Sequence, residues 1–525
     1  MIMSQPAQRG QPMFILAEDT ERTQGEDAQS SNITAGKAVS NSVQSTLGPR
    51  GMDKMLVSDS GDVVITNDGA TILEEMDIEH PAAQMIVEVS TTQEEEVGDG
   101  TTTAAVLAGE LLSRAEDLLD DDVHPTSIVE GYHEAARIAQ ETIDERVVEG
   151  SVDDDLLENV AVTSMTGKGT GDIGARPLAE TVVEAIRRVE SDNVDRDSVR
   201  VRTQTGASSS ATELVEGIIS EEEPLHENMP RRVESADIAV LDLDLEVSES
   251  NIDAEYNVTS VDQLNAALDA EESELQTYAD SLVDSGIDVA FVTGDVDDRV
   301  ASALANEGVL AFDSVDDDEA EAISQATAAR FVGTVDDLEA DDFGHAELVR
   351  VEKFGDEELA FIEGGSKAES VTVFVRGGTE HVADELERAL SDGLDVVTAA
   401  IEQGGVVPGA GATEIAIADG IREEAASITG RKQLAVEAFA DALDVLPRTL
   451  ATNAGMDPID ALVELRSTYD SEGTAGIIAE GQTGRVADPL EAGILDPAAV
   501  KREAVESATE AATMITRIDD VISAS

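Results

Sequence analysis

Negative charge limits the conditions under which this chain can become compact. Its 525 residues include 113 Asp and Glu against 33 Lys and Arg, which gives a formal charge of −80 at pH 7. Repulsion of this size opposes folding at low ionic strength, and only 2% of the residues are aromatic. However, 41% are apolar. Because the apolar residues recur with helical or strand periodicity, we predict a folded chain rather than a disordered one.

The acidic residues are spread along the whole chain, whereas lysine occurs only seven times. At about 1 M salt the Debye length is about 3 Å, so carboxylates hardly repel one another, whereas at low salt they do. We therefore expect a protein adapted to molar salt inside the cell. An ordinary acidic protein is the alternative, and the even distribution of the acids argues against it.

Composition also argues against several classes of function. Lys and Arg bind nucleic-acid phosphates and anionic membrane surfaces, and they are scarce in this chain. Neither kind of binding is therefore expected. The sequence has no cysteine, and its six histidines form no metal-binding motif, so disulfides, thiol catalysis and histidine metal sites are not expected. No apolar run reaches 18 residues, and the first residues do not resemble a signal peptide. These features predict a soluble, cytoplasmic protein.

The periodicity of the apolar residues suggests about three domains, in keeping with the chain length. Residues 1–30 are polar and are expected to form a loose arm. Helices are expected from Asn32 to about residue 149, among them 82–94, 101–119 and 125–148, interrupted by two short strand-like runs at 54–58 and 62–66. Strands and helices alternate from about 219 to 373. The remainder is mainly helical. This order predicts an α/β domain inserted into a helical domain that both ends of the chain build.

The strongest local motif is Gly98-Asp99-Gly100-Thr101-Thr102-Thr103, directly before an expected helix. Its glycines let the backbone approach a ligand, and the free amides of a first helical turn attract an anion. Asp99 is unsuited to direct contact with phosphate, but it suits a magnesium ion held between carboxylate and phosphate. A capped helix after a glycine turn explains the spacing equally well.

Two other glycine-rich segments are less specific. Residues 404–411 join two expected helices, and their small side chains would let a purine lie on the backbone, although a flexible joint also explains them. Residues 169–174 match GxGxxG, but the residues before them have helical spacing, so the strand that a dinucleotide site requires is missing. We interpret 169–174 as a loop. No Walker-type phosphate loop occurs in the sequence.

Three single residues have an ordinary and a functional interpretation. Asp392 lies on the polar side of an expected helix, where a carboxylate is usually solvated. Asp496 precedes Pro497 at the expected start of a helix, so its ordinary role is to cap that helix. Lys168 lies between two glycines, which weakly favours contact with an anion because lysine is rare in this chain.

Longer motifs show a resemblance to a known family. They are TLGPRGMDKML at 46–56, ITNDGATIL at 65–73, GDGTTT at 98–103 with AGELL at 108–112, and MITRIDDVI at 514–522. In this order, along nearly the whole chain, they resemble the group II chaperonins, the family of the archaeal thermosome. The resemblance implies a multidomain α and α/β fold: a mainly helical equatorial domain built from both chain ends, a small intermediate domain, and an α/β apical domain with a helical protrusion.

The resemblance also implies domain boundaries. The equatorial, ATP-binding domain would be 1–149 with 405–525, the intermediate hinge domain 150–218 with 374–404, and the apical, substrate-binding domain 219–373. A built-in lid would correspond to 261–285. Candidate lid contacts are Leu264, Leu268 and Leu282, although ordinary amphipathic packing predicts the same residues.

The resemblance assigns roles in a nucleotide site residue by residue. Asp99 would be the metal ligand, Asp68 would align the water or the metal, and Asp392 would activate the attacking water from the intermediate domain. Lys168 would belong to a nucleotide-sensing loop. The implied cofactors are ATP and Mg²⁺, with K⁺ required. The residues that would contact ATP are Leu47, Gly48, Pro49, Gly98, Asp99, Gly100, Thr101, Thr102 and Thr103 at the phosphates, and Gly409, Ala410, Gly411 and Asp496 at the base and ribose.

Some positions depart from the family pattern. Ala410 replaces the middle glycine of the usual GGG turn, which narrows the space for the base by one methyl group. Ser220-Glu221-Glu222 and Thr293-Gly294-Asp295 stand where Asp-Lys-Glu and Gln-Lys-Gly are usual. The loss of these lysines fits salt adaptation, and it places substrate binding and lid closure in question.

The implied function is an ATP-dependent chaperonin subunit that folds non-native proteins inside a double ring of identical or mixed chaperonin subunits. No nucleic-acid or membrane partner is expected. Two alternatives remain, a ring subunit that has lost hydrolysis and a nucleotide-dependent α/β enzyme acting on a small molecule. The presence of Asp68, Asp99 and Asp392 argues against the first. Outside the residues assigned to ATP, the sequence shows no group of polar residues that would form a substrate pocket, which argues against the second.

Overall fold

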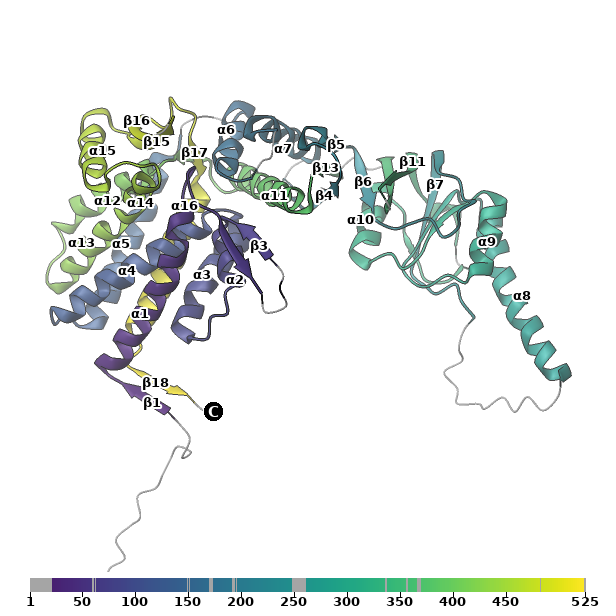
Figure 1. The fold of residues 1–525 in the computed structure, drawn as a ribbon, viewed down its shortest axis with the longest axis horizontal. Coiled ribbons are helices and arrows are strands. Elements are labelled where there is room, and N and C mark those ends of the chain that lie inside the picture. The colour runs from purple at the N-terminus through teal and green to yellow at the C-terminus, as the bar shows by residue number, and fades with distance from the viewer. Residues whose placement is uncertain are drawn as a thin grey trace, which may run out of the picture. The chain divides into compact units, whose positions relative to one another are not determined.

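The computed structural model shows two compact units, of which the first contains both ends of the colour scale in Figure 1. Unit 1 comprises Met1–Gly150 and Val406–Ser525, and unit 2 comprises Ser151–Gly405. The structure describes residues 21–58, 61, 63–148, 150, 152–169, 173–190, 194, 196–247, 261–335, 338–355, 357–365, 370–481 and 483–523, without the side chains of 21, 22, 261–270, 480 and 523. Among these residues, no helix is both long and apolar enough to span a membrane.

Unit 1 is mainly helical. Its first part contains β1 (Glu21–Gln24), α1 (Glu26–Val43), η1 (Gln44–Thr46), β2 (Lys54–Val57), β3 (Val63–Thr66), α2 (Gly69–Glu74), α3 (Pro81–Val97), α4 (Thr101–Asp120) and α5 (Pro125–Arg146). Its second part contains β14 (Val406–Pro408), α12 (Ala412–Ala425), α13 (Arg431–Leu443), α14 (Val445–Asn453), α15 (Pro458–Glu472), β15 (Gly476–Glu480), β16 (Thr483–Ala487), β17 (Leu495–Pro497), α16 (Ala498–Thr516) and β18 (Asp520–Ser523).

Helix α4 lies in the core of unit 1, in contact with helices from both ends of the chain. Ala104, Leu107, Leu111 and Ala115 recur at helical spacing and are fully buried or nearly so. Small residues let the neighbouring backbone approach: a Cβ on Gly109 would lie 2.3 Å from Cβ of Ser40 in α1. Alanine-rich helices packed at close range therefore build a core with few aromatic side chains.

The two chain ends meet in a small sheet. β1 pairs antiparallel with β18, with Thr23 opposite Val521. The prediction of a loose arm through residue 30 is therefore wrong for its last ten residues, which form β1 and the start of α1; residues 1–20 lie outside the described part. The sequence pattern missed β1 because its partner strand lies almost 500 residues further along the chain.

The described residues of unit 2 form two separate sheets. Its elements are α6 (Asp154–Met165), α7 (Ala175–Val189), β4 (Val199–Thr205), β5 (Glu213–Val215), β6 (Gly217–Ser220), β7 (Arg232–Leu241), α8 (Val261–Ser285), β8 (Val289–Val292), α9 (Asp298–Glu307), β9 (Leu310–Phe312), α10 (Asp317–Thr327), β10 (Phe331–Val332), β11 (Gly344–Phe354), β12 (Glu357–Gly365), β13 (Val371–Gly377) and α11 (Glu380–Glu402). One sheet has the order β4-β13-β5. The larger has the order β6-β12-β11-β7-β8-β9, with β10 beside β7.

The larger sheet is mixed, because β7, β8 and β9 are parallel while β11 and β12 run antiparallel to their neighbours. The second half of α8 packs into its core through Leu275, Ala279 and Leu282, which are buried at spacings of four and three residues. Leu282 is thus a core residue, and its assignment as a lid contact is wrong. Leu264 and Leu268 have side chains outside the described part.

Candidate functional site

The loop 98–103 joins α3 to α4 and ends at the first turn of α4. Gly100 has φ +84°, a conformation that side chains with a Cβ rarely adopt. The Gln93 side-chain amide donates to the carbonyl oxygen of Asp99 at 2.7 Å and so holds the loop. In the described part of the chain, no side chain caps α4. The amides of Thr101, Thr102 and Thr103 therefore form a site suited to a phosphate group.

Asp68 links the starts of two helices. Its Oδ2 accepts from the backbone amide of Thr71 at 2.7 Å and so caps α2, while Oδ1 accepts from Thr101 Oγ1 at 3.2 Å. The two helix starts are tightly packed, because a Cβ on Gly69 would lie 2.4 Å from Thr102 Oγ1. The predicted water-aligning residue therefore lies against the predicted phosphate loop.

The segment Leu47-Gly48-Pro49 lies beside the same helix start. Thr46 Oγ1 is 3.3 Å from Thr102 Oγ1. The Asn453 side-chain amide donates to the carbonyl oxygen of Leu47 at 2.9 Å, which ties the segment to the second part of unit 1. Sequence analysis missed Asn453, because an isolated asparagine far along the chain carries no local signal.

The turn Gly409-Ala410-Gly411 is brought to this region by strand pairing and by Leu450. β14 pairs with β17, so Val407 lies opposite Asp496. A Cβ on Gly48 would lie 2.3 Å from Leu450 Cδ2, and one on Gly411 would lie 3.5 Å from Leu450 Cδ1. Leu450 therefore contacts both glycine turns, which are more than 360 residues apart.

Ala410 adopts the left-handed conformation, with φ +57°, which costs about 1 kcal/mol for a residue with a Cβ. Its carbonyl oxygen accepts from the amide of Ile477 at 2.9 Å. Its methyl group occupies space beside Gly476, where an added Cβ would lie only 2.9 Å from it. The alanine in the glycine turn is thus matched by a glycine in β15.

Asp496 does not cap α16, so the capping interpretation is wrong. α16 begins at Ala498, and no described side chain caps it. Asp496 Oδ2 lies 2.8 Å from Lys501 Nζ, which is also 2.7 Å from Glu414 Oε1. Burial by itself would lower the pKa of Lys501, but Asp496 and Glu414 outweigh it and raise that pKa. Lys501 is therefore charged, with a side chain only 12% exposed.

Sequence analysis missed Lys501, although a signal was present. It is one of seven lysines in the chain, and the rarity argument that singled out Lys168 applies to it equally. Its partner Glu414 is buried, and its Oε2 has no hydrogen-bond partner in the described part. Lys501 belongs to α16, so its ion pairs join this helix to Asp496 of β17 and to Glu414 of α12.

The other two predicted residues, Lys168 and Asp392, lie in unit 2. Lys168 follows α6 and forms an ion pair with Asp392 of α11, and each side chain is 16% exposed. Asp392 is therefore not a solvated surface acid, and that ordinary interpretation is wrong. One turn later, Asp395 Oδ1 accepts from Arg196 at 2.5 Å. Burial raises the pKa of Asp395, against the opposing effects of Arg196 and Lys168.

The GxGxxG match at 169–174 follows a helix. α6 ends at Met165 and α7 begins at Ala175, so a helix stands where a dinucleotide site requires a strand. Residues 170–172 lie outside the described part. The helical interpretation of the preceding residues is confirmed.

The described residues fit magnesium and ATP. No group of three or more His, Cys, Asp or Glu that could enclose a metal occurs among them. Mg²⁺ is usually held by one or two carboxylates, water and substrate phosphates. Asp99, whose Oδ1 accepts from the amide of Gly100 at 2.6 Å, and Asp68, whose Oδ1 accepts from Thr101, supply two carboxylates at the start of α4.

Comparisons with known proteins agree on one family. Residues 39–525 match the TCP-1/cpn60 chaperonin family. Thermosome subunit 3 of Haloferax volcanii is 66% identical over 517 residues, covering 98% of this chain and 99% of the relative. Thermosome subunit alpha of Halobacterium salinarum is 53% identical, covering 98% and 92%. Thermosome subunit beta of Methanothermobacter thermautotrophicus is 48% identical, covering 99% and 96%.

The chain therefore belongs to the TCP-1/cpn60 chaperonin family. Its helical unit built from both chain ends and its inserted unit with a mixed sheet are consistent with the multidomain α and α/β fold expected for a chaperonin.

Proposed function

We propose that this chaperonin subunit binds ATP with Mg²⁺ in unit 1 and hydrolyses it to drive the folding of non-native proteins. The observation that carries the proposal is the convergence of Asp68 and Asp99 on the uncapped start of α4. The membership of a chaperonin family supports the link to protein folding. K⁺ is the monovalent cation we propose for the reaction, and the cytoplasm the compartment.

The chain's own residues would act as follows. The amides of Thr101, Thr102 and Thr103 bind phosphate oxygens, and the Gly409-Ala410-Gly411 turn with Asp496 holds the nucleoside. Asp99 and Asp68 would hold magnesium, which when bound neutralises the charge that develops on the phosphates. Asp392 orients the attacking water and accepts its proton, and Lys168 holds the Asp392 carboxylate in place.

The placement of these residues in two units supports coupling to movement. Asp68 and Asp99 belong to unit 1, whereas Asp392 belongs to unit 2. Hydrolysis then requires the domain carrying Asp392 to close on the nucleotide, which makes closure a gating step. A residue that arrives by domain closure links each turnover to a change of shape.

We also propose that unit 2 comprises two domains, an intermediate hinge domain at 150–218 with 374–404 and an apical domain at 219–373. The separate sheets support this division. Because β13 pairs with β4 and β5 rather than with the larger sheet, we move residues 371–373 from the apical to the hinge domain, which then comprises 150–218 and 371–404. With 1–149 and 405–525, the chain then has three domains.

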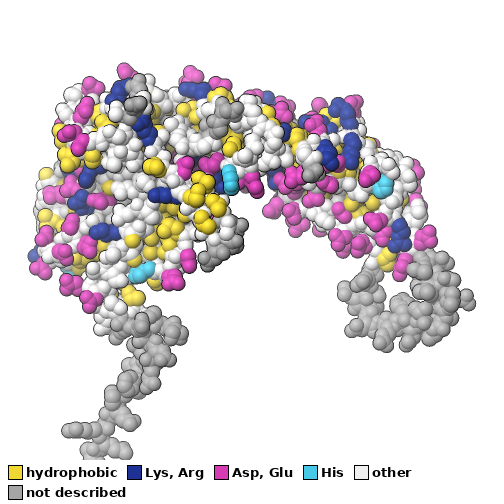
Figure 2. Space-filling model, in the orientation of Figure 1, with side chains coloured by type: hydrophobic (Ala, Val, Ile, Leu, Met, Phe, Trp, Pro, Cys, Tyr) yellow, Lys and Arg dark blue, Asp and Glu magenta, His cyan; other side chains and the backbone are white. Residues whose placement is uncertain are grey.

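We propose that the β2–β3 hairpin docks on another chaperonin subunit in a ring. Met52, Met55 and Val57 are 69%, 66% and 64% exposed, and Val63 and Ile65 also face solvent. Figure 2 shows apolar side chains gathered over this hairpin. A two-stranded sheet is marginal by itself, and an apolar patch on it suits a protein interface. Met55→Asp should release subunits from the ring, as measured by size-exclusion chromatography, and Met55→Leu should not.

The function is tested by ATP hydrolysis and refolding in molar KCl. The assembled particle should hydrolyse ATP only with magnesium and should raise the recovery of a chemically denatured enzyme. Asp392→Ala should bind ATP but lose at least about 100-fold in turnover, the usual size of a general-base effect. Full turnover in Asp392→Ala would overturn its role. Absence of turnover in the unaltered particle would favour a structural ring subunit.

A further inference from the structure

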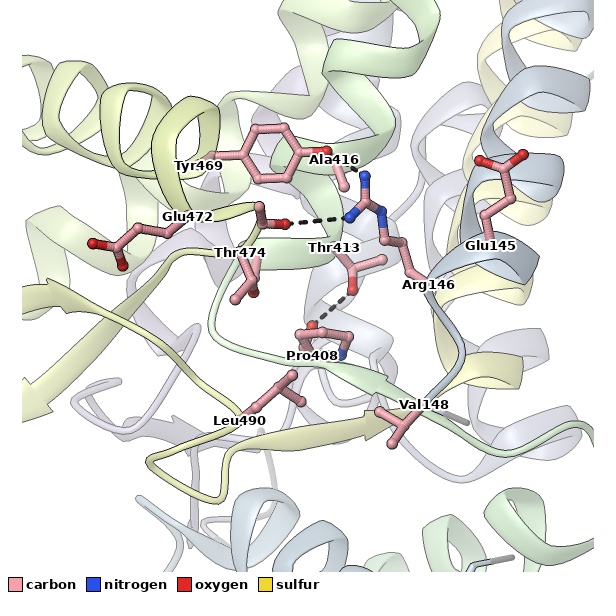
Figure 3. Close-up of a pocket in the computed structure, with 12 residues that line it drawn as sticks. Glu145, Arg146, Val148, Pro408, Thr413, Ala416, Tyr469, Glu472, Thr474 and Leu490 are labelled. Carbon is pink, nitrogen blue, oxygen red and sulfur yellow. Dashed lines mark hydrogen bonds between the residues drawn. The ribbon is translucent and has the colours of Figure 1, made fainter. Parts of the chain in front are cut away.

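A cavity of about 390 Å³ lies in unit 1, outside the residues assigned above to ATP (Figure 3). It is formed by the end of α5, the start of α12, the end of α15 and the segment before β17. Pockets for small molecules typically measure about 300–1,000 Å³, and a cavity of about 150 Å³ already holds benzene. The space is therefore sufficient for a small organic molecule.

Arg146 supplies the positive charge of this cavity. Its Nη2 donates to the hydroxyl of Tyr469 at 2.5 Å and its Nη1 to the carbonyl oxygen of Gly473 at 3.2 Å. Its Nε is buried and has no hydrogen-bond partner among the described residues. Although the chain has 113 acids, no ion pair to Arg146 occurs in the described part. A guanidinium that is partly withdrawn from solvent and has an N–H without a partner favours an anionic ligand.

A second unused donor lines the same cavity. Thr474 Oγ1 is buried without a hydrogen-bond partner in the part of the chain that the structure describes. By contrast, the hydroxyl of Thr413 donates to the carbonyl oxygen of Pro408 at 2.7 Å. Figure 3 shows Arg146, Thr413 and Thr474 around one space above Pro408. Buried donors without partners are costly, and two of them on one cavity indicate a missing acceptor.

Part of the wall is apolar. Val148, Pro408, Ala412, Ala416 and Leu490 line it. Glu145 and Glu472 also belong to the lining, and the carboxylate of Glu472 is directed away from Arg146 in Figure 3. The cavity thus combines unused donors with an apolar surface.

We propose that this cavity binds a small organic carboxylate with a short apolar body. Its carboxylate accepts hydrogen bonds from Arg146 Nε and Thr474 Oγ1, and its apolar part lies against Val148, Pro408 and Leu490. A lone halide ion would satisfy the charge of Arg146 but would leave most of the apolar wall without contact.

The cavity lies beside the residues of unit 1 that precede and follow the inserted segment in the chain. The backbone amide of Val148 donates to the carbonyl oxygen of Val406 at 2.9 Å, so the outgoing and returning chain segments are joined there. Val148 and Pro408 both line the cavity. A bound carboxylate would contact both segments.

Equilibrium dialysis tests this proposal with radiolabelled isobutyrate and isobutyramide, which have the same apolar body but differ in charge. The assembled particle in molar potassium sulfate should bind isobutyrate saturably and at least about tenfold more tightly than isobutyramide, as loss of a hydrogen bond to a charged group predicts. Thr474→Val and Arg146→Gln should each weaken isobutyrate binding by about tenfold. Arg137→Gln, on the same helix but outside the cavity, should leave it unchanged.

Three results would overturn the proposal: no saturable binding, equal binding of the amide, or complete displacement of isobutyrate by chloride at equal concentration. The last result would identify a halide site. Because Arg146 also links α5 to α15, its replacement can loosen the fold. Thr474→Val keeps the side-chain shape and removes only the hydroxyl, so unchanged binding in a Thr474→Val particle of normal size counts against the proposal.

Discussion

Lys168 is held against the carboxylate of Asp392, and both side chains are largely withdrawn from solvent. The lysine comes from the loop after α6 and the aspartate from the middle of α11, so packing of these elements creates the pair. A general base must be held in one orientation to act on a water molecule. We therefore propose that Lys168 acts in hydrolysis by positioning Asp392, without touching the nucleotide.

Replacing Lys168 by methionine should lower ATP turnover by about tenfold or more, because Asp392 loses the cation that orients it. Lys168→Arg should restore part of the activity, since it restores the positive charge. Lys353→Met, at an exposed position of β11, serves as the control. The measurement is the turnover number at saturating magnesium–ATP in molar KCl, and unchanged turnover in Lys168→Met would contradict the positioning role.

Asp99→Asn should weaken magnesium-dependent nucleotide binding by roughly 100-fold or more. Loss of a residue that only holds a metal ligand in place lowers metal affinity by about 10–100-fold, and loss of the ligand itself should lower it further. Asp68→Asn should affect turnover more than binding, since an amide oxygen can still cap α2. Binding of a fluorescent ATP analogue, with and without magnesium, distinguishes the two variants. Equal affinity in Asp99→Asn with magnesium present would exclude Asp99 as the ligand.

Lys501→Met should destabilise unit 1 by about 3–5 kcal/mol, because it leaves the largely buried carboxylates of Asp496 and Glu414 without their cation. Lys432→Met removes a more exposed ion pair to Glu134 and should cost less than about 1 kcal/mol. Denaturant unfolding in molar KCl measures both. If both variants lose a similar free energy of unfolding, burial does not determine how much these ion pairs stabilise the fold.

Transfer from molar KCl to about 0.1 M should dissociate or unfold the particle, because screening then extends to about 10 Å and the carboxylates repel one another. Acidic side chains are distributed over the face shown in Figure 2. Light scattering reports particle size and circular dichroism reports helix content. Unchanged values of both across the dilution would reject salt adaptation.

Glu222→Gln should change the pH dependence of stability in unit 2. Burial raises the pKa of Glu222 to about 7, with Glu319, Asp313, Asp316 and Glu221 adding to the effect. A carboxyl whose pKa is raised on folding stabilises the fold below its unfolded value of about 4.5, and this contribution is lost as the pH rises through about 7.

The melting temperature of Glu222→Gln in molar KCl should therefore exceed that of the unaltered protein at pH 8 and match it near pH 4.5. Glu223→Gln, at the exposed neighbouring position, should show no such pH dependence. A pH-independent difference for Glu222→Gln would show that the substitution acts through packing instead.

Local features of the sequence predicted much of unit 1. Expected helices at 82–94, 101–119 and 125–148 correspond to α3, α4 and α5, and strand-like runs at 54–58 and 62–66 correspond to β2 and β3. Helical spacing and glycine turns are encoded within a few residues, so a single sequence is enough to place them. Local sequence also gave one wrong prediction: Asp496 lies near a helix start, but it does not cap that helix.

The sequence by itself determined the family, most of the helices of unit 1, and the glycine loop at 98–103 that we propose binds phosphate, because these depend on contiguous residues. The tertiary structure decided that Leu450 contacts both Gly48 and Gly411, that Asp496 pairs with Lys501 beside Glu414, and that β1 pairs with β18. Contacts between residues hundreds of positions apart, and the burial that shifts their charges, follow from the path of the folded chain.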